Sequence, residues 1–465
     1  MVKNKPVYAF EEADSKKRML LGGKGAGLSE MTRLKLPVPP GFTITTEVCN
    51  KYYDNNGKLP KDVMPAVMKN ITKMEKKTGK KWNSTKNPLL VSVRSGAAIS
   101  MPGMMDTILN LGLNEKTVEG FAEQTKNPRF SWDSYRRFIQ LFGKVVFGVN
   151  DEKFDRVLDA AKEKQGVTDD SKLNVESLKT IVSKYKKICE EHTKRKFPDT
   201  PDEQLVLSIE AVFKSWMGER AIVYREKNNI TKDIANGTAV NVVTMVFGNM
   251  GDDSATGVVF TRNGHNGKKE IEGEYLINAQ GEDVVAGVRT GKSIELLKKD
   301  MPKSHKELSN ACSKLEKHFR EPQDIEFTIE QGKFYLLQTR TAKMSAGALV
   351  KTSVDMVKEK LIDKNKALTR IPAQQLEALL HRTMDESKIR DFKQLAKGIA
   401  ASPGAASGIV VFDVKKAIEL GDSGKKVILV RKETKPEDVP AFFSSEGILT
   451  SLGGKSSHAA IVSRG

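Results

Sequence analysis

The chain has 465 residues, of which 29% are charged, and its mean hydropathy is −0.42. This length and composition fit a globular protein of about three domains. They exclude a membrane-spanning chain, because no apolar run approaches the roughly 18 residues that a transmembrane helix needs.

The N-terminus and the cysteines indicate the cellular compartment in which the protein works. Residues Met1–Pro6 lead directly into an apolar stretch and show neither the apolar core of a signal peptide nor the Arg/Ser bias of a transit peptide. The three cysteines, Cys49, Cys189 and Cys312, are scattered and odd in number, which is typical of reduced thiols. We therefore expect a cytoplasmic protein with no membrane partner.

The formal net charge of +18 raises the alternative of a nucleic-acid-binding protein. Lysines cluster at Lys76–Lys81 and Lys184–Lys187, but acidic residues flank both runs and no nucleic-acid motif accompanies them. A solvated basic face explains the charge better, and such a face attracts anionic nucleotides. We expect no nucleic-acid partner.

Residues 1–340 have a mixed α and β pattern that begins with a strand at Val7–Phe10. The next feature is Leu21–Leu28, in which four glycines surround Lys24 before a helix. Backbone amides of such a turn can approach an anion closely while the lysine supplies charge. The spacing matches neither a Walker loop nor a dinucleotide-binding loop, and a plain Gly-rich turn is an equal alternative.

Candidate phosphate-binding arginines follow at two places in the chain. Arg94 lies in an apolar strand that opens into a Gly-rich loop, Val91–Ala97, where a guanidinium can fork onto phosphate oxygens. An edge arginine in a salt bridge is the alternative. Arg136 and Arg137 lie in a helical stretch and add a second possible guanidinium; their alternative is an exposed helix charge.

The stretch Gln323–Arg340 predicts a β-hairpin with Gly332 in its turn. Alternation of period two puts Asp324 and Glu326 on one face, and Gln338 and Arg340 share a face of the returning strand. Two carboxylates one pleat apart are a natural oxygen site for Mg²⁺, which takes one or two carboxylates together with substrate phosphates. A solvent-facing acidic strand is the alternative.

From Ser345 to about Lys397 the pattern is helical, and we interpret residues 341–397 as a linker that packs on or between domains. A new domain begins at Gly398 and contains the predicted strands Ile409–Phe412 and Val427–Val430.

Residues Leu452–Val462 close this last domain with a glycine pair, two hydroxyl residues that can cap a helix, and His458 on the first helical turn. Free N–H groups at a helix start favour an anion, and neutral imidazole is nucleophilic near pH 7. A polar cap or core histidine is the alternative when the residue is taken alone. With the phosphate donors and the acidic hairpin, His458 indicates a phosphoryl-transfer enzyme in which positioning and charge neutralisation carry catalysis.

These motifs resemble, in order, the N-terminal half of the pyruvate, phosphate dikinase family, over nearly the whole chain. The stretches that carry the resemblance are Leu21–Leu28, Pro37–Phe42, Met101–Asp106, Met245–Gly251, Asn278–Gly287, Gln323–Arg340, Ala401–Gly408 and Leu452–Val462, which we call the histidine loop. Met101–Asp106 and Asn278–Gly287 favour this family over the related phosphoenolpyruvate synthases.

The resemblance implies an α+β multidomain protein. It has an ATP-grasp nucleotide-binding domain with subdomains (1–340), a helical linker (341–397) and a swivelling β/β/α phosphohistidine domain (398–465). It implies ATP or AMP and phosphate or pyrophosphate as ligands, with Mg²⁺ as cofactor. The phosphorylated histidine falls on His458, the metal-binding carboxylates on Asp324 and Glu326, and the nucleotide- or phosphate-binding residues on Lys24, Arg94, Arg137, Glu282, Gln338 and Arg340.

Two departures from the family lie beside the histidine. Ser456 stands where the family usually has the threonine that is the regulatory phosphorylation site of plant members, so Ser456 is a candidate phosphosite. Lys455 replaces an apolar residue and adds positive charge beside His458.

The resemblance also implies that the swivelling domain is cut after its histidine helix begins and that the pyruvate-binding α/β barrel is absent. We therefore expect a fragment that carries at most the ATP and phosphate half-reaction. Pyruvate or phosphoenolpyruvate, and the family homodimer, would require the barrel. Two alternatives stay open: a synthase-like dikinase that uses water, and an inactive truncated nucleotide-binding paralogue.

Overall fold

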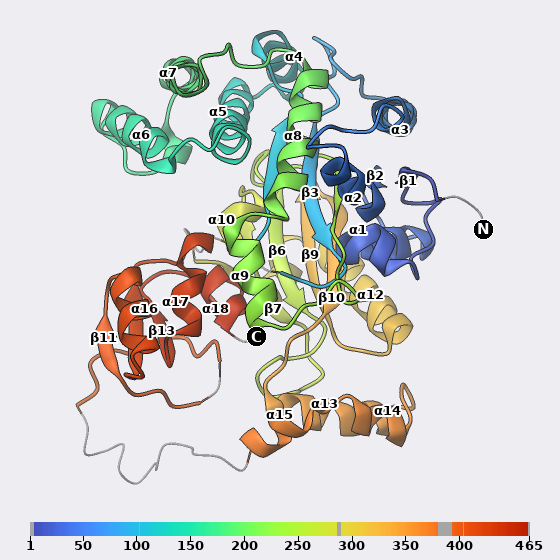
Figure 1. The fold of residues 1–465 in the computed structure, drawn as a ribbon, viewed down its shortest axis with the longest axis vertical. Helices are drawn as coiled ribbons and strands as arrows, with labels where there is room; N and C mark the ends of the chain where they lie inside the picture. Colours follow the sequence, from blue (N-terminus) through green and yellow to red (C-terminus); the bar gives the residue numbers. More distant parts are fainter. Residues whose placement is uncertain (1–3, 102, 286–289, 380–392, 403, 464–465) are drawn as a thin grey trace. The chain divides into compact units, whose positions relative to one another are not determined.

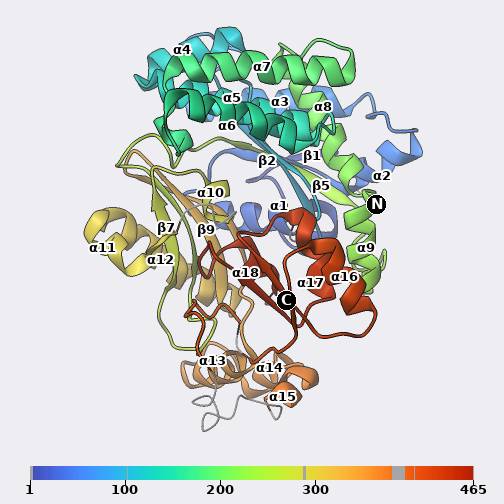
Figure 2. The same cartoon turned by 90° about the vertical axis from the view of Figure 1, so that its left-hand side faces the viewer.

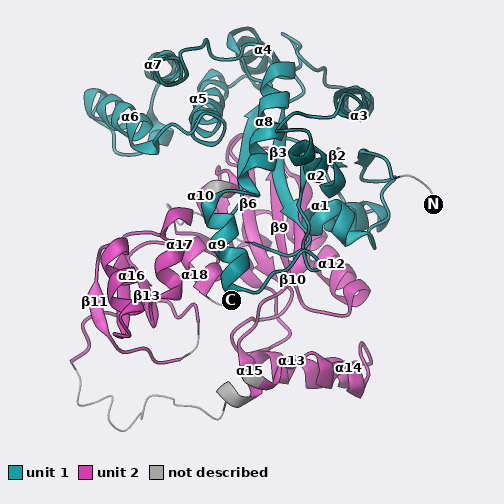
Figure 3. Cartoon of the chain, in the orientation of Figure 1, with its two compact units in different colours: residues 1–246 teal, residues 247–465 magenta. Residues whose placement is uncertain are grey.

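The computed structural model describes residues 4–101, 103–285, 290–379, 393–402 and 404–463 (Figure 1). The chain divides into two compact units, Met1–Val246 and Phe247–Gly465 (Figure 3). The predicted domain boundaries at residues 340 and 397 both fall inside the second unit, and they stay predictions.

The first unit contains a five-stranded sheet of order β1-β2-β5-β3-β4 in which every pair is antiparallel. Its strands are β1 (Val7–Ala9), β2 (Gly41–Ile44), β3 (Val91–Ala97), β4 (Thr107–Leu111) and β5 (Thr238–Thr244). Strand β5 is buried at every position and is the central strand of the sheet. The strand predicted at Val7–Phe10 and the one predicted around Val91 are confirmed.

Helices pack around this sheet and form a separate bundle beside β4. The helices are α1 (Arg18–Arg33), α2 (Thr46–Asp54), α3 (Val63–Thr78), α4 (Glu115–Thr125), α5 (Pro128–Val145), α6 (Asp151–Gln165), α7 (Val175–Thr193), α8 (Pro201–Ser215) and α9 (Glu219–Lys227), with a 3-10 turn, η1, at Asp170–Lys172. Figure 2 shows α5, α6 and α7 side by side. Aromatic residues fill this bundle; the rings of Phe154 and Tyr185, for example, lie 4.8 Å apart.

The second unit begins with another antiparallel five-stranded sheet, of order β10-β9-β6-β7-β8. Its strands are β6 (Ala255–Phe260), β7 (Glu272–Ile277), β8 (Lys292–Ser293), β9 (Gln323–Glu330) and β10 (Lys333–Thr341). Helices α10 (Gly281–Val285), α11 (Leu297–Asp300) and α12 (Pro302–Phe319) and the turn η2 (Ile294–Leu296) connect them, and α12 packs on β9 and β10.

Helices α13 (Ala346–Lys358), α14 (Lys364–Thr369) and α15 (Ala373–Ala378) confirm the helical character of the predicted linker. Its last part differs, because residues 393–400 form neither helix nor strand. The start of the linker is anchored by Arg262, which is fully buried and forks onto Glu316 of α12 and onto Glu359 just after α13. Since both forks are bidentate, α13 is fixed to the preceding sheet.

The last part of the chain is a three-stranded parallel sheet of order β11-β12-β13, formed by Ile409–Val411, Val427–Arg431 and Gly447–Thr450. Helices α16 (Val414–Asp422), α17 (Val439–Phe443) and α18 (His458–Ser463) and the turn η4 (Pro436–Asp438) accompany it. Its core consists of Val411, Ala417, Val427, Leu429 and Ala441. Both predicted strands are confirmed within one residue of their ends.

Within the described ranges, no helix has the length and apolarity that crossing a membrane would require.

Candidate functional site

The Gly-rich turn places Lys24 against the end of β3. Gly22 has φ +69° and interrupts α1, and a Cβ on it would lie 1.8 Å from the carbonyl oxygen of Gly96. A Cβ on Gly96 would in turn lie 3.3 Å from Cβ of Lys24. Only glycine allows this close backbone approach, so the turn that begins the helical segment of Lys24 is fixed by sterics.

Arg94 lies two residues before Gly96 on β3, so its side chain shares the face of the strand that meets Lys24. Arg94 pairs with Thr107 of β4 and with Asn241 of β5. Strand β3 is therefore interior to the sheet, so Arg94 does not lie on an edge strand, and its phosphate-binding role stays a prediction. The first unit thus brings two of the predicted phosphate-binding residues to one strand face.

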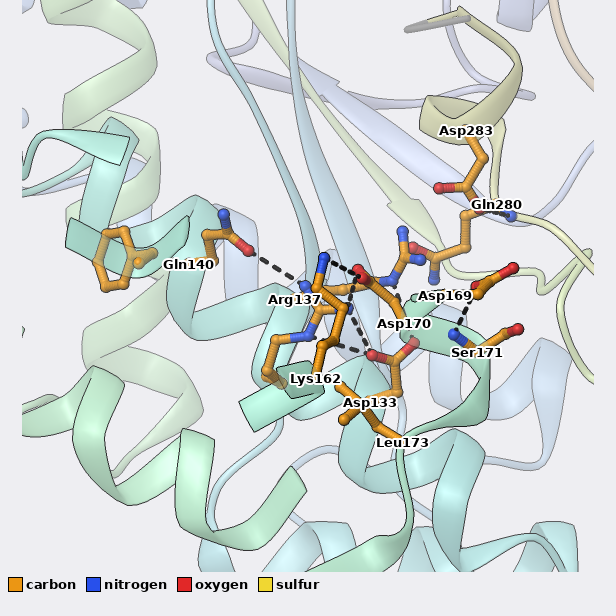
Figure 4. A network of polar contacts seen from close by, with 12 residues as sticks. Asp133, Arg137, Gln140, Lys162, Asp169, Asp170, Ser171, Leu173, Gln280 and Asp283 are labelled. Atoms are coloured by element: carbon orange, nitrogen blue, oxygen red, sulfur yellow. Dashed lines mark hydrogen bonds and ion pairs between the residues drawn. The ribbon is translucent and has the colours of Figure 1, made fainter. Parts of the chain in front are cut away.

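Arg137 lies on α5, which packs on β4 through a hydrogen bond from Asn110 Nδ2 to the carbonyl of Ser134. Arg137 Nε donates to Asp133 Oδ2 over 3.2 Å (Figure 4). The neighbouring Arg136 is 3% exposed, whereas the side chain of Arg137 is 19% exposed. The alternative of two exposed helix charges is wrong, and of the two guanidinium groups Arg137 is the more accessible.

The β9–β10 hairpin is confirmed, with Gln331 and Gly332 in its turn at φ 48° and 73°. Its register pairs Asp324 with Arg340 and Glu326 with Gln338. A bulge between Leu336 and Gln338, which the alternation did not predict, shifts the returning strand by one residue.

Both cross-strand pairs are bonded. Arg340 Nε donates to Asp324 Oδ2 over 2.6 Å, and Gln338 Nε2 donates to Glu326 Oε1 over 2.9 Å. Burial by itself would lower the pKa of Arg340, but the charges of Asp324 and Glu326 outweigh it and raise that pKa. Asp324 is only 4% exposed, so the alternative of a solvent-facing acidic strand is wrong for this residue.

The hairpin residues have the chemistry that Mg²⁺ requires. Asp324 and Glu326 supply carboxylates from one strand face, and Gln338 Oε1 is buried without a hydrogen-bond partner among the described residues. Mg²⁺ binds carboxylate and amide oxygens and keeps sites for phosphates. Within the described ranges, no group of three or more His, Cys, Asp or Glu side chains is placed so that it could hold a metal ion.

His458 begins α18, as predicted, and is 7% exposed. Its Nδ1 lies 3.1 Å from Thr434 Oγ1, while Nε2 is buried and has no hydrogen-bond partner among the described residues. Burial lowers the pKa of His458, and the charges of Asp438 and Glu437 oppose this shift. The ring is therefore held neutral near pH 7, with one nitrogen oriented and the other available for bonding.

The histidine loop is bonded to β7. Lys455 Nζ pairs with Glu272 Oε1 over 2.6 Å, and its backbone N–H donates to Glu274 Oε1 over 3.3 Å. Ser456 is 1% exposed, and its hydroxyl donates to Glu274 Oε2 over 3.2 Å. Since β7 and β9 belong to one sheet, the loop of His458 contacts the sheet that carries Asp324 and Glu326.

The structure does not describe the side chain of one predicted site residue, and some residues that contact the site were not predicted from the sequence. The side chain of Glu282 lies outside the described residues, although its backbone is part of α10. Thr434 and the two glutamates of β7 were not predicted. The position of Thr434, just after the carboxyl end of the parallel strand β12, is the signal that could have found it, because ligand-contacting residues gather at such ends.

Comparison with known proteins assigns the C-terminal part of the chain to a class of domain. Residues 424–465 match the family described as PEP-utilising enzyme, mobile domain. Residues 18–61, 55–308 and 302–361 match the family described as pyruvate phosphate dikinase, AMP/ATP-binding domain. The chain therefore belongs to the pyruvate, phosphate dikinase family.

Relatives in this family align over nearly the whole chain. The chain is 54% identical over 461 residues to the pyruvate, phosphate dikinase of Entamoeba histolytica, covering 99% of this chain and 52% of the relative. Identity to the enzyme of Clostridium symbiosum is 51% over 460 residues, with the same coverage. Identity to the chloroplastic pyruvate, phosphate dikinase 1 of Arabidopsis thaliana is 47% over 469 residues, covering 48% of that protein. The chain spans about half the length of the curated relatives it matches.

Proposed function

We propose that this chain carries the nucleotide half-reaction of a pyruvate, phosphate dikinase, in which ATP phosphorylates His458. The observation that carries the proposal is the environment of the imidazole: Nδ1 contacts Thr434 Oγ1, and Nε2 has no hydrogen-bond partner among the described residues. With the proton on Nδ1 donated to Thr434, the lone pair lies on Nε2 and can attack phosphorus.

In this proposal the Nε2–P bond forms at the β-phosphorus of ATP. The bond from that phosphorus to the oxygen bridging to the α-phosphorus breaks, and AMP leaves with the oxygen. An oxygen of inorganic phosphate attacks the γ-phosphorus and gives pyrophosphate. The bond from the γ-phosphorus to the oxygen that bridges it to the β-phosphorus breaks, and that oxygen stays on the β-phosphoryl group of His458. The proton remains on Nδ1 and is hydrogen-bonded to Thr434 Oγ1, so no further base is needed on the histidine side.

The remaining site residues neutralise and orient the phosphates. Lys24, Arg94, Arg137 and Arg340 each carry a positive charge that can bind phosphate, which suits a reaction whose catalysis rests on positioning and electrostatics. Asp324 and Glu326 would hold Mg²⁺, with Gln338 contacting the metal or the nucleotide. Bound there, Mg²⁺ would neutralise phosphate charge. Glu282 is a further nucleotide-binding candidate from the family resemblance.

The bonds from the histidine loop to β7 support a phosphorylation-competent state in which His458 is held on the sheet of Asp324 and Glu326. Ser456 is a candidate regulatory phosphosite in this state, because a phosphoryl group there would meet the carboxylate of Glu274. Conversion of pyruvate to phosphoenolpyruvate and the family homodimer belong, in this proposal, to a chain of the relatives' full length.

We also propose that the protein works in a reducing compartment such as the cytosol. Its three cysteines are free and buried, and burial raises the pKa of each thiol to about 12, so they are inert structural residues.

The phosphate-binding assignment is tested by Mg-ATP titration calorimetry of Lys24→Ala and Arg94→Ala, with the exposed Lys61→Ala as control. Each site variant removes charge-assisted hydrogen bonds of roughly 1.5–3 kcal/mol, so its affinity should fall about ten- to a hundredfold. Wild-type affinity in both site variants would refute the assignment. A requirement for inorganic phosphate in AMP formation would separate this reaction from the water-using alternative.

A further inference from the structure

The histidine loop meets β7 through two glutamates that lie one pleat apart. Glu272 and Glu274 are residues i and i+2 of β7, so their side chains share one face of the strand. A Cβ on Gly454 would lie only 2.1 Å from Glu274 Oε2, so the backbone of the loop is seated directly on that carboxylate. The loop is therefore close enough to β7 for individual side chains to control how firmly it binds.

The two glutamates bind the loop in different ways. Glu274 accepts from two neutral donors, the backbone N–H of Lys455 over 3.3 Å and the hydroxyl of Ser456 over 3.2 Å. Any residue except proline at position 455 would supply that backbone N–H. Glu272 instead pairs with the ammonium of Lys455, with 2.6 Å between Oε1 and Nζ. The contact between opposite charges thus depends on the side chain of Lys455.

The carboxylate of Glu272 is oriented independently of the histidine loop. Its second oxygen, Oε2, accepts from the backbone N–H of Gly264 over 3.2 Å. The side chain of Glu272 is 18% exposed and that of Lys455 is 34% exposed, so the pair is partly shielded from solvent. Without the ammonium, Glu272 and Glu274 would keep two negative charges on one strand face, where like charges repel. Binding of the loop therefore gains from an ion pair whose acceptor is already in place.

We propose that Glu272 is a positioning residue that acts through Lys455 to hold the histidine loop, and with it His458, on β7 for phosphorylation. This inference rests on the proposed function, in which His458 accepts the phosphoryl group while the loop is bound there. It assigns the electrostatic part of that binding to one pair of side chains. Because the pair is partly exposed, its contribution weakens as the ionic strength rises.

A double-mutant cycle with hydrogen exchange as the readout tests the contact itself. The variants are Lys455→Met, Glu272→Gln, whose amide oxygen can still accept from Gly264, and the double variant. Amides of residues 453–457 should exchange about fivefold faster in each single variant at low ionic strength, because loss of the pair lets the loop open more often. The double variant should exchange within about twofold of the faster single variant, since both changes remove the same pair.

The charge of Lys455, rather than its shape, should determine the effect. Lys455→Arg keeps the charge, so its loop should exchange within about twofold of the wild-type rate. The difference between wild type and Lys455→Met should fall below about twofold near 1 M salt, where the screening length is roughly 3 Å. Lys416→Met and Glu419→Gln are the matched controls, because these two residues form an ion pair within α16, with 3.1 Å between Nζ and Oε2. They should leave exchange of the loop unchanged.

The rate at which His458 takes label from ATP labelled at the β-phosphorus then tests the positioning role. This rate should fall about fivefold in Lys455→Met and in Glu272→Gln at low ionic strength, and Lys455→Arg should keep most of it. Additive exchange effects in the cycle, equal losses in Lys455→Arg and Lys455→Met, or wild-type labelling despite faster exchange would each overturn the inference. An unlabelled wild type would refute the proposed function, and the exchange rates would still decide whether the ion pair holds the loop.

Discussion

Arg340 and Asp324 are cross-strand partners on β10 and β9, and the guanidinium Nε of Arg340 donates to Asp324 Oδ2 over 2.6 Å. The next bonded pair, Gln338 with Glu326, lies on the same strands. The two candidate metal ligands are thus each oriented by a side chain of the returning strand. This arrangement preorganises the carboxylates before a metal binds, which lowers the entropic cost of binding.

Replacing either candidate metal ligand should weaken Mg-dependent nucleotide binding. Asp324→Asn and Glu326→Gln keep the size of the side chain and remove its charge, so Mg-ATP affinity should fall about tenfold or more while metal-free ATP binding changes little. Titration calorimetry with and without Mg²⁺ measures both values. The exposed Glu295→Gln is the control, and an equal loss with and without the metal would contradict a metal-binding role.

Removing the hydroxyl that contacts His458 should slow its phosphorylation. Thr434→Val is nearly isosteric but cannot accept a hydrogen bond from Nδ1, so the tautomer with the lone pair on Nε2 is no longer favoured. We expect the rate of phosphoryl transfer to fall about tenfold, with Mg-ATP affinity unchanged. Thr450→Val on β13 is the control. A wild-type rate in Thr434→Val would show that the contact does not orient the ring.

The buried imidazole predicts a defined pH dependence of stability. Burial lowers the pKa of His458 below its ordinary 6.5, so between the two values the unfolded state binds more protons than the folded state. The contribution is fully present above about pH 6.5 and is lost as the pH falls towards the lower folded-state pKa. Urea unfolding of wild type and His458→Gln at pH 7.5 and 5.5 checks the sign. The wild type should lose more stability than the variant at pH 5.5, and an equal loss would contradict a lowered pKa.

Close backbone packing should make Gly22 intolerant of a side chain. Gly22→Ala adds a methyl group that overlaps the carbonyl of Gly96 and strains a backbone at φ +69°, so the variant should lose about 2–5 kcal/mol. Gly424→Ala is the matched control, because its φ is +81° but nothing lies within 4 Å of the new Cβ. The control should lose only the cost of the backbone strain, about 1–2 kcal/mol. Equal melting temperatures of the two variants would exclude the predicted steric contact.

Negative charge at Ser456 should reduce phosphorylation of His458. Ser456→Glu would put a carboxylate beside that of Glu274 in a buried position, and this repulsion should reduce His458 labelling by about tenfold or more. Ser456→Ala should keep most of the labelling, and Glu274→Gln should restore part of it in the Ser456→Glu background. Labelling of Ser456→Glu at the wild-type level would mean that the bonds to β7 are not needed for transfer.

The hairpin could be predicted from sequence because its information is local. Alternation over Gln323–Ile329 and the glycine of the turn determine the strands, the turn and the shared face of Asp324 and Glu326. The bulge near Leu336 could not be predicted, since it depends on pairing across the hairpin rather than on alternation along one strand. The start of α18 at His458 was likewise predictable from the glycine pair and the capping residues before it.

Contacts between distant segments could not be predicted in this way. Thr434 precedes His458 by 24 positions, and only the folded domain brings its hydroxyl to the ring. The sequence alone does not distinguish the adjacent Arg136 and Arg137, because their different burial depends on how α5 packs in the bundle. The departure at Lys455 indicated extra positive charge beside His458. Its partner Glu272 could not be predicted, because it lies on a strand 183 residues earlier in the chain.

The most direct test of the central claim uses ATP labelled at the β-phosphorus, with Mg²⁺ and inorganic phosphate. We predict acid-labile label on His458 that requires phosphate and is absent from His458→Ala. Label that persists in His458→Ala, or no label although Mg-ATP binds tightly, would contradict the claim that this chain carries out the nucleotide half-reaction.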